Sequence, residues 1–346
     1  MQNGERLAVS SIGRHRQTIM GVAILGILLF HGRAAVSGEA IIQYGFAGVK
    51  YFLQIGVDIF LLLSGLGCGH SLAVGGFEEQ RGSSAIRFWG RRLKRILPKY
   101  LLITGIYCAI CAFTSESFNW MSAVEDYSLI TFFTKGNLKE WFIAGILLLY
   151  FLTPFFYWLL NVNRTAYSIL EGLIVACALV VSLSDASSSL KIVNEIFIAR
   201  IPVYMTGIAF SRKLESAEPV LQKRTALFLL TALLVCYMAN RMFNTTNEMC
   251  VERLLFWPTA IALSLLLANE FERGRIPGRA FFGFLGTVTL ELYMTHEKIL
   301  GFFHWSDQYP LWYAWLFDAA AILIAIGVSL LIRRLFALFE RRRQTL

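Results

Sequence analysis

The chain has 346 residues, of which 56% are hydrophobic and only 16% are charged. A soluble globular domain carries about 25% charged residues, so this composition excludes an ordinary soluble domain and predicts an integral membrane protein. The net charge of +9 could indicate nucleic-acid binding. Basic cytoplasmic loops explain it more simply in a membrane chain, and we expect no nucleic-acid partner.

Apolar segments recur along the whole chain, and each is close to the roughly 20 residues that a membrane helix needs. Ten are predicted, at 17–36, 47–72, 98–114, 141–160, 166–183, 193–211, 224–241, 252–269, 281–301 and 312–333. Most Lys and Arg residues fall on the inner side if both termini are cytoplasmic. The prediction is an all-α polytopic bundle of about ten transmembrane helices, forming one domain over residues 1–346. The short apolar segment at 123–134 is expected to be re-entrant or interfacial on the outer side.

The first apolar segment ends in the polar stretch ILLFHGRAAV (Ile27–Val36). If its helix enters the membrane near Thr18, a rise of about 1.5 Å per residue puts His31 roughly 20 Å in. The hydrocarbon core is about 30 Å thick, so His31 can lie in a polar cavity and transfer a proton near neutral pH. The simpler alternative is that His31 and Arg33 mark the exit of the helix into water.

The second apolar segment ends in a glycine-rich stretch, SGLGCGHS, which begins at Ser64 and Gly65. Glycine lets another backbone or a ligand approach a helix closely. Close packing of helices is the alternative explanation, because small residues are common at membrane helix interfaces.

A basic run, RFWGRRLKRILPKY (Arg87–Tyr100), follows this stretch. Arg92 and Arg95 are three residues apart, so both guanidinium groups can reach one anion, and Arg91 is their neighbour. Guanidinium groups bind phosphate oxygens bidentately, so the run predicts a phosphate site on the inner side. The alternative is an anchor lying on anionic lipid. Pro98 is expected to end the basic segment or to open the next helix.

The ionisable residues inside predicted spans include Asp58, Arg200, Glu291 and His296. Placing such a group in the membrane costs on the order of several kcal/mol, so each is a candidate functional residue. A buried ion pair is the alternative for Asp58 and Arg200, and an interfacial position is the alternative for His296.

Several well-known motifs are absent from the sequence. It has no HExxH, GxSxG or Walker A motif, which weighs against metal-dependent hydrolysis, α/β-hydrolase chemistry and ATP-driven transport. The CxxC pattern of Cys108 and Cys111 lies in an apolar helix and is interpreted as packing. We expect no metal.

Three stretches in order, ILLFHG, GVDIFLLLSGL and FWGRRLKRILPKY, resemble the acyltransferase-3 family of membrane acyltransferases, with weaker similarity in EWFIAGILLLYFLTP, RIPVYMTG and LELYMTHEKI. Such proteins acylate bacterial surface glycans and related acceptors. The resemblance implies that His31 is catalytic and that Arg92 and Arg95 bind acyl-coenzyme A. Many members carry an arginine eleven residues before the histidine, where this chain has Met20. In this chain, Arg16 or Arg200 would then take the role of that arginine.

The resulting functional hypothesis is a multi-pass enzyme of the bacterial plasma membrane. It would transfer an acyl group from acetyl-CoA or another cytoplasmic acyl-CoA to a hydroxyl of an envelope glycan or small acceptor. His31 would be the general base, or would carry the acyl group covalently. The other predicted roles are CoA binding by Arg91, Arg92, Arg95, Ser64 and Gly65, orientation of His31 by Asp58 or Glu291, oxyanion stabilisation by Arg200, and substrate contacts from Trp141, Tyr293 and His296.

Two alternatives stay open at this point. In a transporter or flippase-like protein, the intramembrane charges at Asp58, Arg200 and Glu291 would line a solute path. A non-catalytic sensor of the same fold would bind acyl-CoA without turnover.

Overall fold

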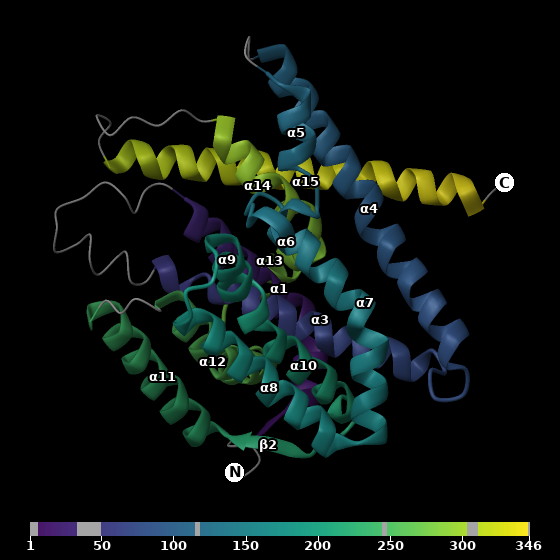
Figure 1. Ribbon diagram of the computed structural model, residues 1–346, viewed down its shortest axis with the longest axis vertical. Helices are drawn as coiled ribbons and strands as arrows, with labels where there is room; N and C mark the ends of the chain where they lie inside the picture. The colour runs from purple at the N-terminus through teal and green to yellow at the C-terminus, as the bar shows by residue number, and fades with distance from the viewer. Residues whose placement is uncertain (1–5, 33–49, 115–117, 244–247, 303–310, 345–346) are drawn as a thin grey trace. The chain divides into compact units, whose positions relative to one another are not determined.

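The computed structural model describes residues 6–32, 50–114, 118–243, 248–302 and 311–344 (Figure 1). Within these residues the chain is almost entirely helical. One small antiparallel sheet pairs β1 (Arg6–Ala8) with β2 (Pro219–Gln222), with Leu7 opposite Leu221. The predicted all-α class is confirmed. The suggested helix exit at Arg33 falls outside the described residues.

The helical elements follow the predicted apolar segments closely. They are α1 (Val9–His31), α3 (Ile55–Val74), α4 (Arg81–Thr114), α5 (Trp120–Asp126), α6 (Thr131–Lys135), α7 (Trp141–Val162), α8 (Arg164–Leu183), α9 (Ser188–Ile196), η2 (Ile198–Arg200), α10 (Ile201–Phe210), η3 (Ser211–Lys213), α11 (Lys223–Phe243), α12 (Glu248–Glu272), α13 (Arg279–Thr287), α14 (Thr289–Phe302) and α15 (Leu311–Gln344). Seven helical spans among the described residues are long and apolar enough to cross a membrane. The protein is therefore polytopic, and the count of ten spans stays a prediction.

The basic run differs from its prediction. It does not form a separate segment, because α4 continues from Arg81 to Thr114 with Pro98 inside it. The expectation that Pro98 ends or opens a helix is therefore wrong. Proline removes one backbone hydrogen bond, but the many remaining bonds of a 34-residue helix can hold both halves together, and membrane helices tolerate such breaks.

Two other predicted spans are interrupted. The segment 193–211 divides into α9, the short helix η2 and α10, which has Pro202 in its first turn. Proline suits the first turn because its missing N–H needs no partner there. The segment 281–301 divides at Val288 into α13 and α14. Both interruptions lie beside candidate site residues, Arg200 and Glu291.

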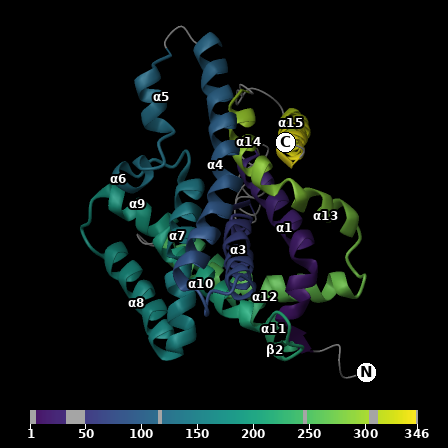
Figure 2. The same ribbon diagram turned by 90° about the vertical axis from the view of Figure 1, so that its right-hand side faces the viewer.

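The chain forms two compact units, each assembled from separate stretches of sequence. The first unit comprises Met1–Arg16, Asp58–Ile96 and Cys108–Arg275; the second comprises Gln17–Val57, Leu97–Tyr107 and Ile276–Leu346. In the first unit, α8 packs on α7 and α9, and α11 packs along α12 (Figures 1 and 2). In the second unit, α14 packs on α15.

Glycines allow helix backbones to touch within each unit. A Cβ at Gly65 of α3 would lie 2.2 Å from the carbonyl oxygen of Tyr204, and one at Gly207 of α10 would lie 2.2 Å from that of Leu62. Real Cβ atoms do not approach backbone this closely, so α3 and α10 need glycine at both positions. This approach supports the packing alternative for Gly65, and its contact with CoA stays a prediction.

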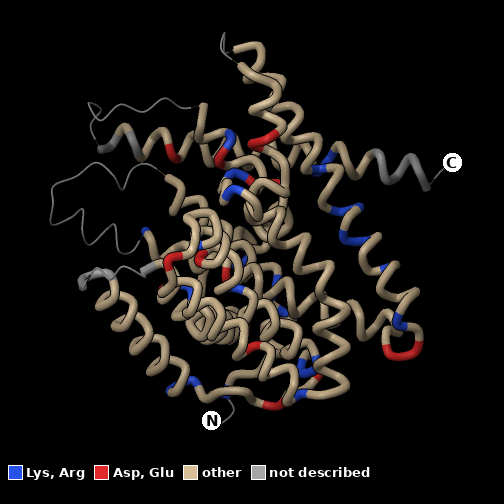
Figure 3. Tube along the Cα trace, viewed as in Figure 1, with Lys and Arg blue, Asp and Glu red and all other residues tan. Residues whose placement is uncertain are grey.

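Charged residues are distributed unevenly along the helices. Lys and Arg recur along the first half of α4, whereas long stretches of the other spans carry no charge (Figure 3). The first half of α4 is therefore a cationic surface that an anion can approach.

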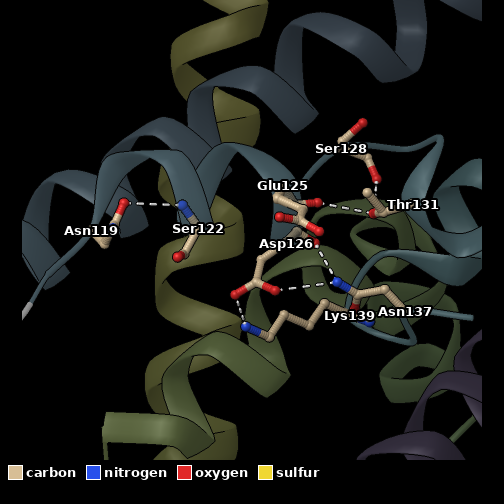
Figure 4. Close-up of polar contacts among 8 residues, drawn as sticks. All are labelled: Asn119, Ser122, Glu125, Asp126, Ser128, Thr131, Asn137 and Lys139. Carbon is tan, nitrogen blue, oxygen red and sulfur yellow. Dashed lines mark hydrogen bonds and ion pairs between the residues drawn. The ribbon is translucent and has the colours of Figure 1, made fainter. Parts of the chain in front are cut away.

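The segment between α4 and α7 folds into the short helices α5 and α6. Asn119 caps α5 by accepting hydrogen bonds from the backbone N–H groups of Met121 and Ser122. Figure 4 shows the bond from Ser122 and the pairing of Lys139 with Asp126. Exposed apolar side chains are Trp120, Met121, Val124 and Ile130. An interfacial position suits such a surface, and that position stays a prediction.

Candidate functional site

His31 is the last residue of α1 and lies beside a carboxylate in the second unit. Its Nε2 is 3.1 Å from Oε1 of Glu297 on α14. An ionised carboxylate oxygen only accepts hydrogen bonds, so a hydrogen bond across this distance places the proton on His31 Nε2. In the neutral imidazole, Nδ1 is then the basic nitrogen. The His31–Glu297 pair therefore has the parts of an oriented general base.

His296 lies next to this pair and its two nitrogens have opposite surroundings. Its Nδ1 is 2.8 Å from the carbonyl oxygen of Tyr293 and 3.1 Å from that of Leu292. Both carbonyls accept, so Nδ1 carries the proton and Nε2 has a free lone pair. Nε2 is buried and has no hydrogen-bond partner among the described residues. The His31 and His296 rings meet edge to face, 4.9 Å between centroids.

The predicted residue Tyr293 also belongs to this group. Its ring is 5.5 Å from the ring of His296. The second unit thus brings together His31, Tyr293 and His296, all predicted from the sequence. It adds Glu297, which the sequence reasoning missed although it directly follows His296 in the stretch MTHEK.

Glu291, predicted as one candidate to orient His31, has a different partner. It is buried and forms an ion pair with Lys99 of α4. The carboxylate beside His31 is that of Glu297. The structure therefore gives Glu291 the role of neutralising a lysine.

Asp58, the other candidate to orient His31, is paired in the first unit. Its Oδ1 and Oδ2 accept hydrogen bonds from Nε of Arg200, at 3.2 and 3.4 Å. The two side chains are only 1% and 2% exposed. Arg200 Nη1 also donates to the carbonyl oxygen of Ile196 at 2.6 Å, and its guanidinium lies 5.1 Å from the Trp141 ring.

This cluster has the geometry of a structural ion pair. Arg200 is engaged by Asp58 and by backbone, and Trp141 covers it. A buried guanidinium without its carboxylate would be strongly destabilising. The contacts therefore favour the buried-pair alternative. They do not support the predicted roles of Asp58 in orienting His31, of Arg200 in stabilising an oxyanion or of Trp141 in contacting substrate.

The arginines form a second candidate site, centred on Gly67 of α3 in the first unit. Arg92 Nη2 donates to the Gly67 carbonyl oxygen at 3.4 Å, and Arg16 Nε donates to that of Leu63 at 3.1 Å. A Cβ at Gly67 would lie 3.1 Å from Arg16 Nη2. Glycine thus leaves room for the Arg16 guanidinium group at this turn of the helix.

Three neighbouring arginines concentrate positive charge near Gly67. Arg16, Arg92 and Arg95 are close enough to interact electrostatically. The Arg92 guanidinium also lies 5.1 Å from the ring of Phe88 and 5.4 Å from that of Tyr150, which holds its planar group in place. Three neighbouring guanidinium groups repel one another, so a bound anion would stabilise them.

The remaining predicted CoA contacts lie near this cluster in the sequence. Arg91 Nη2 is 3.4 Å from Ser71 Oγ, and its side chain is exposed. Ser64 is partly buried on α3. Arg16, which the resemblance suggested only as a substitute for a missing arginine at Met20, reaches the Gly67 turn together with Arg92.

These observations define a class of protein: a polytopic helical membrane protein with an imidazole–carboxylate pair and an arginine cluster. Comparison with protein families identifies it further. Residues 19–334 match the model of the acyltransferase domain, Acyl_transf_3, over nearly the whole chain. The chain belongs to the acyltransferase-3 family and is a membrane enzyme that transfers acyl groups. Neither the curated proteins nor the solved structures compared with it gave a significant match.

Proposed function

We propose that this enzyme transfers an acyl group from cytoplasmic acyl-CoA to a hydroxyl of an envelope glycan or small acceptor, with His31 as general base. Acetyl-CoA is the proposed donor, and the bacterial plasma membrane is the proposed location. The observation that carries the proposal is the 3.1 Å contact between His31 Nε2 and Glu297 Oε1. The carboxylate can hold the imidazole in a fixed orientation, which a general base for acyl transfer to a hydroxyl requires.

In the proposed reaction, His31 Nδ1 accepts the proton of the acceptor hydroxyl while the oxygen of that hydroxyl attacks the thioester carbonyl carbon. A C–O bond forms, the C–S bond breaks, and the proton passes from the imidazolium to the leaving thiolate. Glu297 stabilises the imidazolium between these steps. General base catalysis of this kind typically contributes about 10²- to 10⁴-fold.

The buried lone pair of His296 supports a role in acceptor binding. Nε2 of the neutral ring can only accept a hydrogen bond, and a substrate hydroxyl is a suitable donor. Tyr293, whose ring lies beside that of His296, offers an aromatic surface against which a sugar or other acceptor can pack.

The arginine cluster supports the choice of donor. Coenzyme A carries several phosphate groups, and guanidinium groups bind phosphate oxygens bidentately. Arg16 and Arg92 present two such groups at Gly67, and Arg95 is close enough to interact electrostatically with Arg16. Arg91, exposed on the same helix as Arg92, is available to a further phosphate.

The test uses the full chain purified in detergent, with acetyl-CoA and an envelope glycan fraction from cells lacking the gene. Release of free CoA measures turnover, and mass spectrometry of the glycans identifies the acylated product. We expect acetylated product with the wild type and none with His31→Ala at equal expression. Product formation by His31→Ala at the wild-type rate would overturn the base assignment, and absence of turnover with any acyl-CoA would overturn the choice of donor.

A further inference from the structure

We propose that His31, His296 and Glu297 also form a binding site for a divalent transition-metal ion. One nitrogen or oxygen from each of the three side chains lies within 4.8 Å of the others. The set comprises two imidazoles and one carboxylate, which is a common ligand set for zinc and related ions. This inference does not rest on the proposed function, because metal binding can be measured without a substrate.

His296 carries the inference, because it has the arrangement of a metal ligand. Metal-binding histidines typically donate the N–H of one ring nitrogen to a backbone carbonyl or carboxylate, which orients the other nitrogen toward the ion. In His296, Nδ1 has this bond to Tyr293. Nε2 is buried with its lone pair unused among the described residues. A buried polar atom without a partner is costly, and a bound cation would satisfy it.

The distances are close to those that an ion requires. His31 Nε2 and Glu297 Oε1 are 3.1 Å apart. Ligand atoms held tetrahedrally by Zn²⁺ at about 2.0 to 2.2 Å are about 3.3 to 3.6 Å apart. Side-chain movements of roughly 1 Å therefore suffice to close the group around an ion. An ion can also enter, because the His31 and Glu297 side chains are 29% and 45% exposed.

Two lysines lie near the three side chains, since Lys50 acts electrostatically on His31 and Lys298 on His296. Lys50 Nζ donates to the Gly32 carbonyl oxygen at 2.7 Å, and Lys298 Nζ lies 5.9 Å from the centre of the Tyr107 ring. Lys50 also interacts electrostatically with Asp318, whose Oδ2 lies beside Gly32. Its positive charge is thus partly compensated near His31, and Glu297 remains the carboxylate in contact with the imidazole.

The choice of ion follows from the ligand atoms. Imidazole nitrogen suits Zn²⁺, Co²⁺ and related ions, whereas Mg²⁺ and Ca²⁺ prefer sites made of oxygen atoms. If Zn²⁺ binds through His31 Nε2, the ring proton must move to Nδ1. The nitrogen proposed as the base is then no longer free, so metal binding and proton transfer exclude one another at His31.

The test is a calorimetric titration of the full chain in detergent with Zn²⁺, after dialysis against a chelator. We expect saturable one-to-one binding by the wild type and by His70→Ala, a control at a histidine of α3 outside the group. His296→Ala and Glu297→Gln should each weaken binding by at least about tenfold. Substitution of a residue that only supports a metal ligand already costs about 10- to 100-fold in affinity.

Glu297→Gln keeps the test decisive if His296→Ala does not fold, because Glu297 is half exposed and the substitution preserves its shape. Mg²⁺ titrated in place of Zn²⁺ should give no saturable binding. Absence of Zn²⁺ binding by the wild type, or equal affinity in Glu297→Gln, would overturn the site. Equal binding of Mg²⁺ would overturn the proposed class of ion. A failed titration would leave the acyl-transfer experiment unaffected, since that experiment measures turnover.

Discussion

Glu297 is the carboxylate in contact with His31, with Oε1 3.1 Å from Nε2. This relationship places the proton on Nε2 and leaves Nδ1 as the basic nitrogen. Glu291 lies on the same helix as Glu297 but has a different partner, because it pairs with Lys99.

The first prediction concerns Glu297 as a positioning residue. Glu297→Gln removes the charge that stabilises the His31 imidazolium, so kcat should fall at least about tenfold while KM for acetyl-CoA stays close to the wild-type value. Glu297→Asp should recover part of the loss. Steady-state kinetics with Glu78→Gln, a substitution at an exposed carboxylate, provides the control. An unchanged kcat in Glu297→Gln would remove this role.

The second prediction concerns the arginines around Gly67. A hydrogen bond to a charged group contributes about 1.5 to 3 kcal/mol, so Arg16→Ala and Arg92→Ala should each weaken acetyl-CoA binding by roughly 10- to 100-fold. The increase in thermal midpoint caused by acetyl-CoA measures this binding. Arg14→Ala is the matched control, because Arg14 lies on the same helix but pairs with Glu272. If Arg16→Ala and Arg14→Ala bind acetyl-CoA equally well, Arg16 has no part in the site.

The third prediction tests the structural interpretation of Asp58. Asp58→Asn leaves the buried Arg200 charge uncompensated, which costs about 3 to 5 kcal/mol. The variant should show a markedly lower thermal midpoint or fail to accumulate as monodisperse protein. The double variant Asp58→Asn/Arg200→Met removes both charges and should recover much of the stability. An Asp58→Asn protein that keeps wild-type stability but loses turnover would point to a catalytic role instead.

The fourth prediction concerns helix packing at Gly65. In Gly65→Ala, the new Cβ would lie 2.2 Å from the Tyr204 carbonyl oxygen, so α3 and α10 would have to separate and the thermal midpoint should fall. Gly105→Ala is the control, because nothing lies within 4 Å of a Cβ there. In a helix interior, that change should be neutral or stabilise by about 0.5 to 1 kcal/mol. Equal thermal midpoints for the two variants would contradict the close approach.

The fifth prediction links the proposed metal site to turnover. Saturating Zn²⁺ should slow acyl transfer by the wild type, because the ion occupies the imidazole that would accept the proton. The residual activity of Glu297→Gln should be less sensitive to the same concentration. The measurement is CoA release with and without chelator. Faster release in the presence of Zn²⁺ would contradict the role of His31 as base.

Local features of the sequence were sufficient to predict the class of protein. The length and hydrophobicity of each span depend on consecutive residues, so the helical polytopic fold and most helix limits follow directly. The order of the stretches around His31, Asp58 and Arg92 likewise indicated the family that the comparison then identified. One exception was Pro98, where a local rule about proline was overridden by the stability of a long helix. The others were the predicted spans 193–211 and 281–301, which the structure divides.

Only the tertiary structure decided which charged side chains are partners. Asp58, Glu291 and Glu297 all lie in or beside predicted spans, and nothing in their local sequence shows which one faces His31. That choice depends on how distant helices rotate and pack against one another. The same packing pairs Asp58 with Arg200 and brings Arg16 and Arg92 to one turn of α3. The sequence alone thus determined which ionisable groups the membrane helices carry, and three-dimensional packing decided their contacts.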